Sequence, residues 1–269
     1  MKLSIQEKEV LHWLIVKSKF GTIMKFKLFS AIAILWIAGC YGQEISSNKI
    51  FKEIALVNGI EFINPKYDQP KFSCGFLIKY NNETFAVTAK HILKIIKPEK
   101  MTTLSLESYI KNWILYPLNN KSEIVICDKL LNEDKSELLE AKSTYDNDWL
   151  VFSIKQNSSS IIPLEIRNTP LIQGEKLYVV GWTRTMENGP QRVYEFEYYK
   201  TISNRILLKD ILVPEKFGGL SGAPLVDENG LLVGIVSNGT VDPDSDKKFF
   251  SPCSITNLVS FMENRKHDK

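Results

Sequence analysis

Short runs rich in β-branched and aromatic residues recur along this 269-residue chain from about Ile45 onward. Clusters of Asn, Asp, Gly, Pro and Lys separate the runs, as turn residues separate strands. Many strands at such close spacing predict an all-β fold built as an antiparallel sandwich or barrel. Examples of these runs span residues 72–80, 84–88, 122–127, 149–154, 176–182, 191–201, 223–226 and 231–237.

Two of the intervals between runs, residues 81–82 and 228–230, have the composition of hairpin turns, and the glycine of the second can take a positive φ. Helical periodicity is confined to a turn near His91 and to residues 254–265. The polar, serine-rich segment 156–160 suggests a boundary between two halves of the domain.

The composition is that of a globular protein and gives no sign of nucleic-acid binding. Hydrophobic residues make up 44% of the chain and charged residues 24%, enough for one large domain or two small cores. The formal net charge of +3 provides no strong field that would select nucleic acid. The oligomeric state stays open.

The cysteines argue against a metal site, and we expect no cofactor. Cys40, Cys74, Cys127 and Cys253 lie far apart, without a CxxC pair or a nearby histidine to complete a zinc set. If Cys40 is removed or modified during export, the other three permit at most one disulfide, whose pairing the sequence leaves open.

Residues 24–43 have the layout of a secretory signal. Two lysines precede an apolar run, residues 28–38, that ends in small residues. The run is too short for a membrane span, which needs roughly 20 residues, so an integral membrane helix is the weaker interpretation. We therefore expect residues 1–43 to be a leader and residues 44–269 to be the folded domain of a protein exported from a bacterial cell.

Two processing sites compete within this leader. Residues 37–40 resemble a bacterial lipobox, which implies a lipid on Cys40 and a membrane-anchored, periplasmic lipoprotein. A cut ahead of Gln43 would instead release a soluble, secreted protein, and we favour the lipid anchor. Because residues 1–23 are unusually long ahead of a signal, Met24 is an alternative start; the other interpretation is an amphipathic helix around residues 10–16 that packs on the domain.

His91 stands just past a predicted strand. A histidine at the end of a strand is often an exposed residue without a catalytic role. The other two histidines of the chain, however, lie in the leader (His12) and in the last three residues (His267). If the folded domain uses histidine as a base near neutral pH, His91 must serve.

Asp148 stands at the entrance of the strongly apolar run that begins at Trp149. A turn acid that caps a strand is one explanation. The functional alternative is a partly buried carboxylate that accepts the Nδ1 proton of an imidazole and stabilises the imidazolium that forms. Asp148 is preferred to Asp146 because it directly adjoins the buried run.

Ser221 lies in the most specific segment, where glycines stand on both sides of it between two apolar runs. A plain Gly/Ser hairpin explains the glycines but not the flanking runs, the second of which ends in Ser-Asn-Gly. Glycines allow a tight loop whose amides can point at a developing oxyanion. A serine hydroxyl is inert without a neighbouring base, so this loop requires a partner such as His91.

These three segments resemble the chymotrypsin-like, or trypsin-like, serine peptidase family. Residues 88–91 match its Thr-Ala-x-His, residues 148–151 its Asp before an aliphatic strand, and residues 219–224 its Gly-x-Ser-Gly-x-Pro. The order His, Asp, Ser and the wide intervals also agree. The resemblance covers roughly residues 72–261 and is greatest to the short bacterial members.

The resemblance implies two six-stranded antiparallel β-barrels with a short C-terminal helix and an active site in the cleft between the barrels. Barrel one would span about 44–157 and barrel two about 158–269. His91 and Asp148 from barrel one and Ser221 from barrel two would be the catalytic residues of a serine endopeptidase, which hydrolyses polypeptide substrates through an acyl-enzyme intermediate.

Matching positions also imply how a substrate would be held. The backbone amides of Gly219 and Ser221 would form the oxyanion hole. Ser237, Asn238 and Gly239 resemble the edge that pairs with the substrate backbone as an added strand.

The chain departs from the family pattern at three positions near Ser221. Leu220 replaces the acid of many animal members, so activation by a salt bridge to a newly cut N-terminus is not expected. Glu215 could lie at the base of the specificity pocket and favour a basic side chain, although Lys216 beside it argues for a solvated loop acid. Ala223 replaces the usual second glycine, a small change that we expect to be tolerated.

Two other classes of function compete with the peptidase. A catalytically silent module on the same fold would bind a peptide or protein without cutting it, although all three catalytic side chains are present. An α/β-hydrolase needs Gly-x-Ser-x-Gly and the order Ser, Asp, His, and here Ala223 occupies the last glycine position and the order is reversed.

Overall fold

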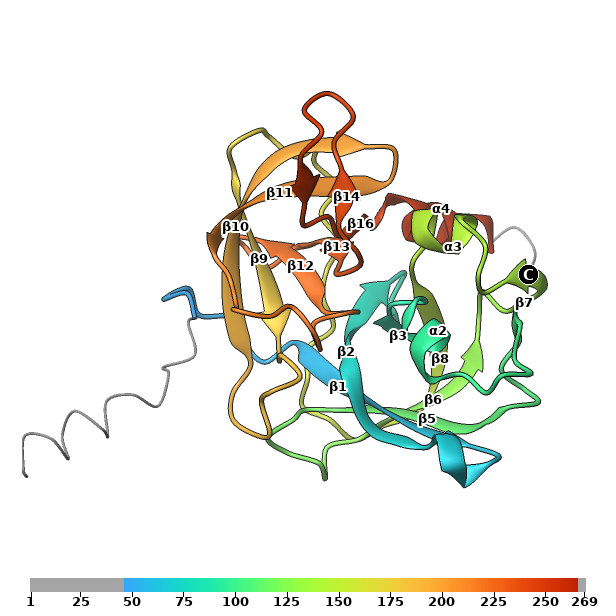
Figure 1. Ribbon diagram of the computed structural model, residues 1–269. Coiled ribbons are helices and arrows are strands. Elements are labelled where there is room, and N and C mark those ends of the chain that lie inside the picture. The colour runs from blue at the N-terminus through green and yellow to red at the C-terminus, as the bar shows by residue number, and fades with distance from the viewer. Residues whose placement is uncertain (1–45, 266–269) are drawn as a thin grey trace, which may run out of the picture. The chain divides into compact units, whose positions relative to one another are not determined.

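A computed structural model describes residues 46–265, so the predicted leader, the lipidation candidate Cys40 and the alternative start at Met24 lie outside the described residues. The described part of the chain forms two closed, six-stranded antiparallel barrels that lie side by side (Figure 1). The predicted fold class is therefore confirmed.

Barrel one closes in the strand order β1–β2–β3–β8–β6–β5. The predicted hairpin at Asn81 and Asn82 joins β2 to β3, and both residues have positive φ (49° and 65°), which matches a two-residue turn to the strand twist. The strands are β1 Ala55–Phe62, β2 Gln69–Tyr80, β3 Glu83–Thr88, β5 Ile110–Tyr116, β6 Val125–Leu130 and β8 Leu150–Asn157.

Barrel two closes in the order β10–β11–β16–β13–β12–β9. The predicted turn between β12 and β13 is present, and Gly230 has a φ of 82°. The strands are β9 Lys176–Gly181, β10 Arg192–Ile202, β11 Arg205–Leu212, β12 Pro224–Asp227, β13 Leu232–Ile235 and β16 Cys253–Ser254.

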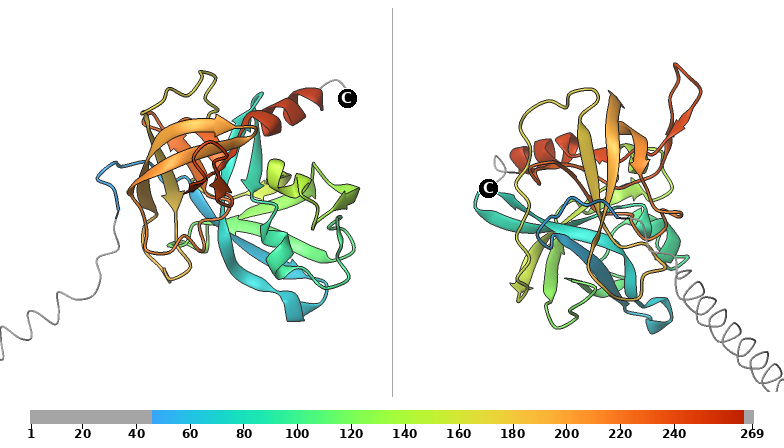
Figure 2. Two further views of the ribbon diagram at one scale, coloured as in Figure 1. Left: turned by 45° about the horizontal axis from the view of Figure 1, so that its top comes forward. Right: turned by 90° about the vertical axis from the view of Figure 1, so that its left-hand side faces the viewer.

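Smaller elements decorate the barrels. The predicted C-terminal helix is α4, and its Phe261 packs on Trp149 of barrel one at 5.2 Å between ring centroids, so α4 extends from barrel two across barrel one (Figure 2). The other elements are η1 Pro65–Tyr67, α2 Ile92–Ile96, α3 Ser143–Asp146, α4 Thr256–Asn264, and two small sheets formed by β4 Thr103–Leu104 with β7 Asp134–Leu138 and by β14 Thr240–Val241 with β15 Lys248–Phe249. No helix within residues 46–265 is long and apolar enough to cross a membrane.

Strand alternation explains how the barrels join. On β2, Leu77 belongs to the core inside barrel one, whereas its neighbours Phe76 and Ile78 belong to the hydrophobic cluster that continues into barrel two. On β3, Ala86 faces the first core and Val87 the second. Because successive side chains point to opposite faces of a strand, these strands are apolar on both faces, and barrel two covers the outer face.

The three cysteines of the described chain, Cys74, Cys127 and Cys253, are all buried and free. No disulfide therefore forms among residues 46–265, and non-covalent contacts hold the barrels together there.

Candidate active site

His91 is positioned by the register of two neighbouring strands. β3 pairs antiparallel with β8, and Thr88 lies opposite Leu150. The residues just after β3 therefore lie beside those just before β8, which brings His91 to Asp148 although 57 positions separate them. His91 is the N-cap residue of α2 and is 7% exposed.

Asp148 holds His91 at two places. Its Oδ1 accepts from the His91 backbone N–H at 2.7 Å, and its Oδ2 accepts from His91 Nδ1 at 2.6 Å. The carboxylate is completely buried. Burial alone would raise the pKa of Asp148, but the hydrogen bonds from His91 and Ser237 and the charge of His91 outweigh it and hold that pKa below its ordinary value.

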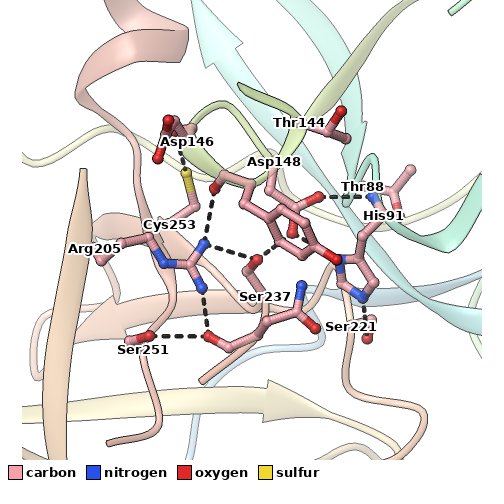
Figure 3. A network of polar contacts seen from close by, with 12 residues as sticks. Thr88, His91, Thr144, Asp146, Asp148, Arg205, Ser221, Ser237, Ser251 and Cys253 are labelled. Atoms are coloured by element: carbon pink, nitrogen blue, oxygen red, sulfur yellow. Dashed lines mark hydrogen bonds and ion pairs between the residues drawn. The ribbon is translucent and has the colours of Figure 1, made fainter. Parts of the chain in front are cut away.

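Ser221 reaches the other ring nitrogen. Its Oγ lies 2.8 Å from His91 Nε2 (Figure 3). Since the ionised Asp148 can only accept, Nδ1 carries the ring proton and Nε2 is free to accept from the serine hydroxyl. The three side chains that the sequence singled out thus form one continuous hydrogen-bonded line across the two barrels.

The nucleophile loop is fastened directly to barrel one. The Cys74 backbone N–H donates to the Ser221 carbonyl at 2.9 Å. At Gly222, where φ is 81°, an added Cβ would lie 2.3 Å from the Cys74 carbonyl oxygen and 2.5 Å from Thr88 Oγ1. Only glycine allows this approach, so Gly222 sets how closely Ser221 comes to His91.

Two backbone amides of the Ser221 loop have no backbone partner among the described residues. Gly219 has a φ of 102°, and a Cβ there would lie 2.3 Å from the Arg184 backbone nitrogen, which itself donates to the Gly218 carbonyl at 2.6 Å. Within residues 46–265, neither the Gly219 nor the Ser221 amide donates a backbone hydrogen bond. Such a pair of unused donors could receive a developing oxyanion.

The predicted substrate edge follows β13. Ser237 donates its hydroxyl proton to Asp148 Oδ2, so its side chain is part of the hydrogen-bonded line. The Asn238 carbonyl accepts from Ser251 Oγ at 2.9 Å. Gly239 lies against β15, because an added Cβ would be 3.0 Å from the Phe249 carbonyl oxygen.

Glu215 is not joined to this site. It is an exposed residue on the loop before Phe217, and no carboxylate hydrogen bond or ion pair forms from it within the described part of the chain. Its assignment to the base of a specificity pocket stays a prediction.

Sequence reasoning missed Arg205, whose NH1 donates to Ser237 Oγ at 2.9 Å and to the Tyr145 carbonyl at 3.1 Å. No local pattern marks it, since its partners are 32 and 60 positions away. The only hint in the sequence is an arginine at the start of an apolar run, and the same pattern is found where a strand simply begins at the solvent-exposed surface.

The described residues contain no group of three or more His, Cys, Asp or Glu side chains that could hold a metal ion.

Comparison with known proteins agrees with this geometry. The sequence model of the trypsin family matches residues 62–259. No curated protein sequence matches the chain.

Two solved structures are similar in fold. GrC, or granzyme C, is 17% identical with a TM-score of 0.55, over 84% of this chain and 99% of its own. A serine endoprotease from Yersinia pestis is 14% identical with a TM-score of 0.49, over 78% of this chain and 62% of its own length. At 17% identity, the likeness to GrC shows the fold alone.

Proposed function

We propose that this chain, which belongs to the trypsin family, is an active serine endopeptidase. One observation carries the proposal: Ser221 Oγ lies 2.8 Å from His91 Nε2, while His91 Nδ1 is bonded to Asp148 at 2.6 Å. A serine needs an oriented base to attack a peptide carbonyl near neutral pH, and this arrangement supports such a base.

The proposed acylation step uses all three side chains. Ser221 Oγ attacks the carbonyl carbon of the substrate, and its proton passes to His91 Nε2. The imidazolium is stabilised by Asp148, which keeps Nδ1 as a donor. The carbonyl oxygen becomes an oxyanion, for which the free amides of Gly219 and Ser221 are the donors.

Collapse of this intermediate breaks the C–N bond, and His91 Nε2 returns the proton to the leaving amine. A water molecule then repeats the sequence: His91 takes its proton, hydroxide adds to the acyl carbon, and the C–O bond to Ser221 breaks as His91 Nε2 returns that proton to Ser221 Oγ. The products are a carboxylic acid and the restored serine. No cofactor enters either half of the reaction.

The substrate we propose is an extended polypeptide that pairs its backbone with residues 237–239 as an added strand. Export from a bacterial cell, with Cys40 as the lipid anchor, stays part of the proposal, because those residues lie outside the described range.

A peptide-library digest tests the activity. The full chain and its Ser221→Ala variant are incubated with the library, and cleavage products are read by mass spectrometry. We expect cleavage by the wild type alone. Saturable binding of library peptides by folded wild-type protein without cleavage would contradict the proposal and favour the silent binding module.

A further inference from the structure

A buried arginine lies behind the Asp148 carboxylate. Arg205 opens β11 and is 7% exposed. A buried cation is costly unless polar groups satisfy it. Within residues 46–265, Arg205 forms no ion pair with a carboxylate; NH1 and NH2 donate to hydroxyl and carbonyl oxygens instead, and the buried Nε has no hydrogen-bond partner there.

Arg205 fixes the direction of the hydrogen bonds that end at Asp148. A guanidinium has donors only, so Ser237 Oγ must accept from Arg205 NH1, at 2.9 Å. The single proton of the Ser237 hydroxyl is then directed to Asp148 Oδ2, with which it makes a short contact. Both the serine and the carboxylate are buried, so solvent offers little competition for these bonds.

The same guanidinium joins three segments of the site (Figure 3). NH1 also donates to the Tyr145 carbonyl, in the α3 turn that leads to Asp148, at 3.1 Å. NH2 donates to the Asn238 carbonyl, in the proposed substrate edge. Arg205 of barrel two is thus hydrogen-bonded to the segment that precedes Asp148, to the hydroxyl of Ser237, and to the carbonyl of Asn238, the residue after Ser237.

We propose that Arg205 is a positioning residue for the proposed peptidase reaction: it orients the Ser237 hydroxyl toward Asp148 and places a buried positive charge behind that carboxylate. Asp148 favours the protonated form of His91, and a cation on its far side opposes this preference. Arg205 therefore keeps more of His91 in the neutral form that can accept the Ser221 proton. This inference rests on the proposed function.

Other charged or titratable groups surround the cluster and stay constant in the test. Asp146 of α3 and Cys253 of β16 interact with Arg205, and Lys90 interacts with Cys253. Lys94 of α2 lies 4.1 Å from the centre of the Tyr145 ring. In the test only the Arg205 charge is removed, and these other groups are unchanged. The direction of the effect is therefore determined: the pH at which His91 takes up its proton moves upward.

The experiment measures His91 protonation by NMR in full-length, histidine-labelled protein, which contains three histidines; His91→Gln identifies the resonance. For Arg205→Gln we expect the titration midpoint to rise by about 0.5 to 1 pH unit, and for Arg205→Lys, which keeps the charge, by less than half of that. The acid limb of the kcat/KM profile should move with it.

Two further variants separate positioning from general destabilisation. Arg167→Gln removes another arginine with a 9% exposed side chain, paired with Glu175 at 2.8 Å in barrel two, and should lower stability without moving the midpoint. Ser237→Ala, which removes the intermediate hydroxyl, should raise the midpoint and serves if Arg205→Gln does not fold.

An unchanged midpoint in folded Arg205→Gln, or in Ser237→Ala where the arginine variant does not fold, overturns the inference. So does an equal shift in Arg205→Lys and Arg205→Gln. Because NMR reads the imidazole whether or not peptides are cleaved, absence of turnover in the wild type would refute the proposed function and leave this test intact.

Discussion

Barrel one and barrel two supply different kinds of group to the site. Barrel one contributes side chains, His91 and Asp148, placed where β3 ends and β8 begins, and the pairing of these strands determines their separation. Barrel two contributes Ser221 and a loop in which the Gly219 and Ser221 amides donate no backbone hydrogen bond within residues 46–265, and glycines with positive φ determine the shape of this loop. Strand register thus sets the proton-handling pair, and loop conformation sets the groups that meet the substrate.

The difference has a structural consequence. The core inside barrel one is a separate cluster, whereas the core of barrel two is continuous with the interface between the barrels. The Ser221 loop also contacts barrel one, through the hydrogen bond from the Cys74 N–H and through the close packing of Gly222. We infer that the geometry of the nucleophile depends on both barrels. The separation of His91 and Asp148 is set by strand pairing within barrel one, while Ser237 and Arg205 of barrel two hold the Asp148 carboxylate.

The largest difference in kcat between the two barrels is expected when one aspartate in each barrel is replaced by asparagine. Asp148→Asn presents an amide donor to His91 Nδ1, which favours the wrong ring tautomer, so kcat should fall about 10,000-fold. Asp227→Asn alters a buried carboxylate of barrel two that accepts from the Asn229 and Leu231 amides. It should cost about 1 to 2 kcal/mol of unfolding free energy and leave kcat nearly unchanged.

Steady-state kinetics and urea unfolding measure both variants. Comparable losses of kcat in the two would mean that Asp148 acts through stability alone and would contradict its assignment as the orienting acid.

A smaller effect is expected from two adjacent glycines of barrel two. Gly219→Ala would force the loop away from the Arg184 nitrogen and turn its amide, so kcat should fall about 100- to 1,000-fold. Gly218→Ala is the matched control, since no atom lies within 4 Å of its added Cβ. Its kcat should stay within about twofold of wild type, because exposed substitutions cost little; similar losses in both variants would argue against the oxyanion role.

The smallest effect concerns the buried thiols. Burial raises the pKa of Cys74 to about 12, that of Cys253 to about 11, and that of Cys127 above its ordinary value. The folded state therefore keeps thiols protonated that ionise near pH 8.5 in the unfolded chain, and stability should decline as pH rises through that value. Each thiol should contribute on the order of 1 kcal/mol of this decline by pH 9.5.

Urea unfolding between pH 7.5 and 9.5 tests this, with a Cys74→Ala, Cys127→Ala, Cys253→Ala triple variant for comparison. Cys40 is present in both proteins, so its contribution cancels. The variant should lose the alkaline decline, and an identical decline in both proteins would show that other groups cause it.

Much of the fold is visible in the sequence because strands and turns are local. Alternation and turn residues predict β2, β3, the β12–β13 hairpin and α4 closely. The predicted strand 122–127 starts too early, because β6 begins at Val125. The backbone amides of Ser122 and Glu123 donate to Asn120 and form a turn there. Strand propensity alone does not predict this turn.

The candidate site divides in the same way. His91, Asp148 and Ser221 can be singled out because each belongs to a local motif. Arg205 cannot, since its role depends on contacts with Tyr145 and Ser237 that exist only after both barrels close. Glu215 differs from both, because its position is only counted from Ser221; its carboxylate is exposed, and its role in a specificity pocket stays a prediction.

Covalent labelling by a fluorophosphonate probe most directly tests whether the base of barrel one activates the serine of barrel two. We predict one adduct per wild-type chain, located on Ser221 by peptide mapping. His91→Ala should fold and react slower by about 1,000-fold or more, because the serine then lacks its base. An adduct on another residue, or equal labelling rates for wild type and His91→Ala, would contradict the account.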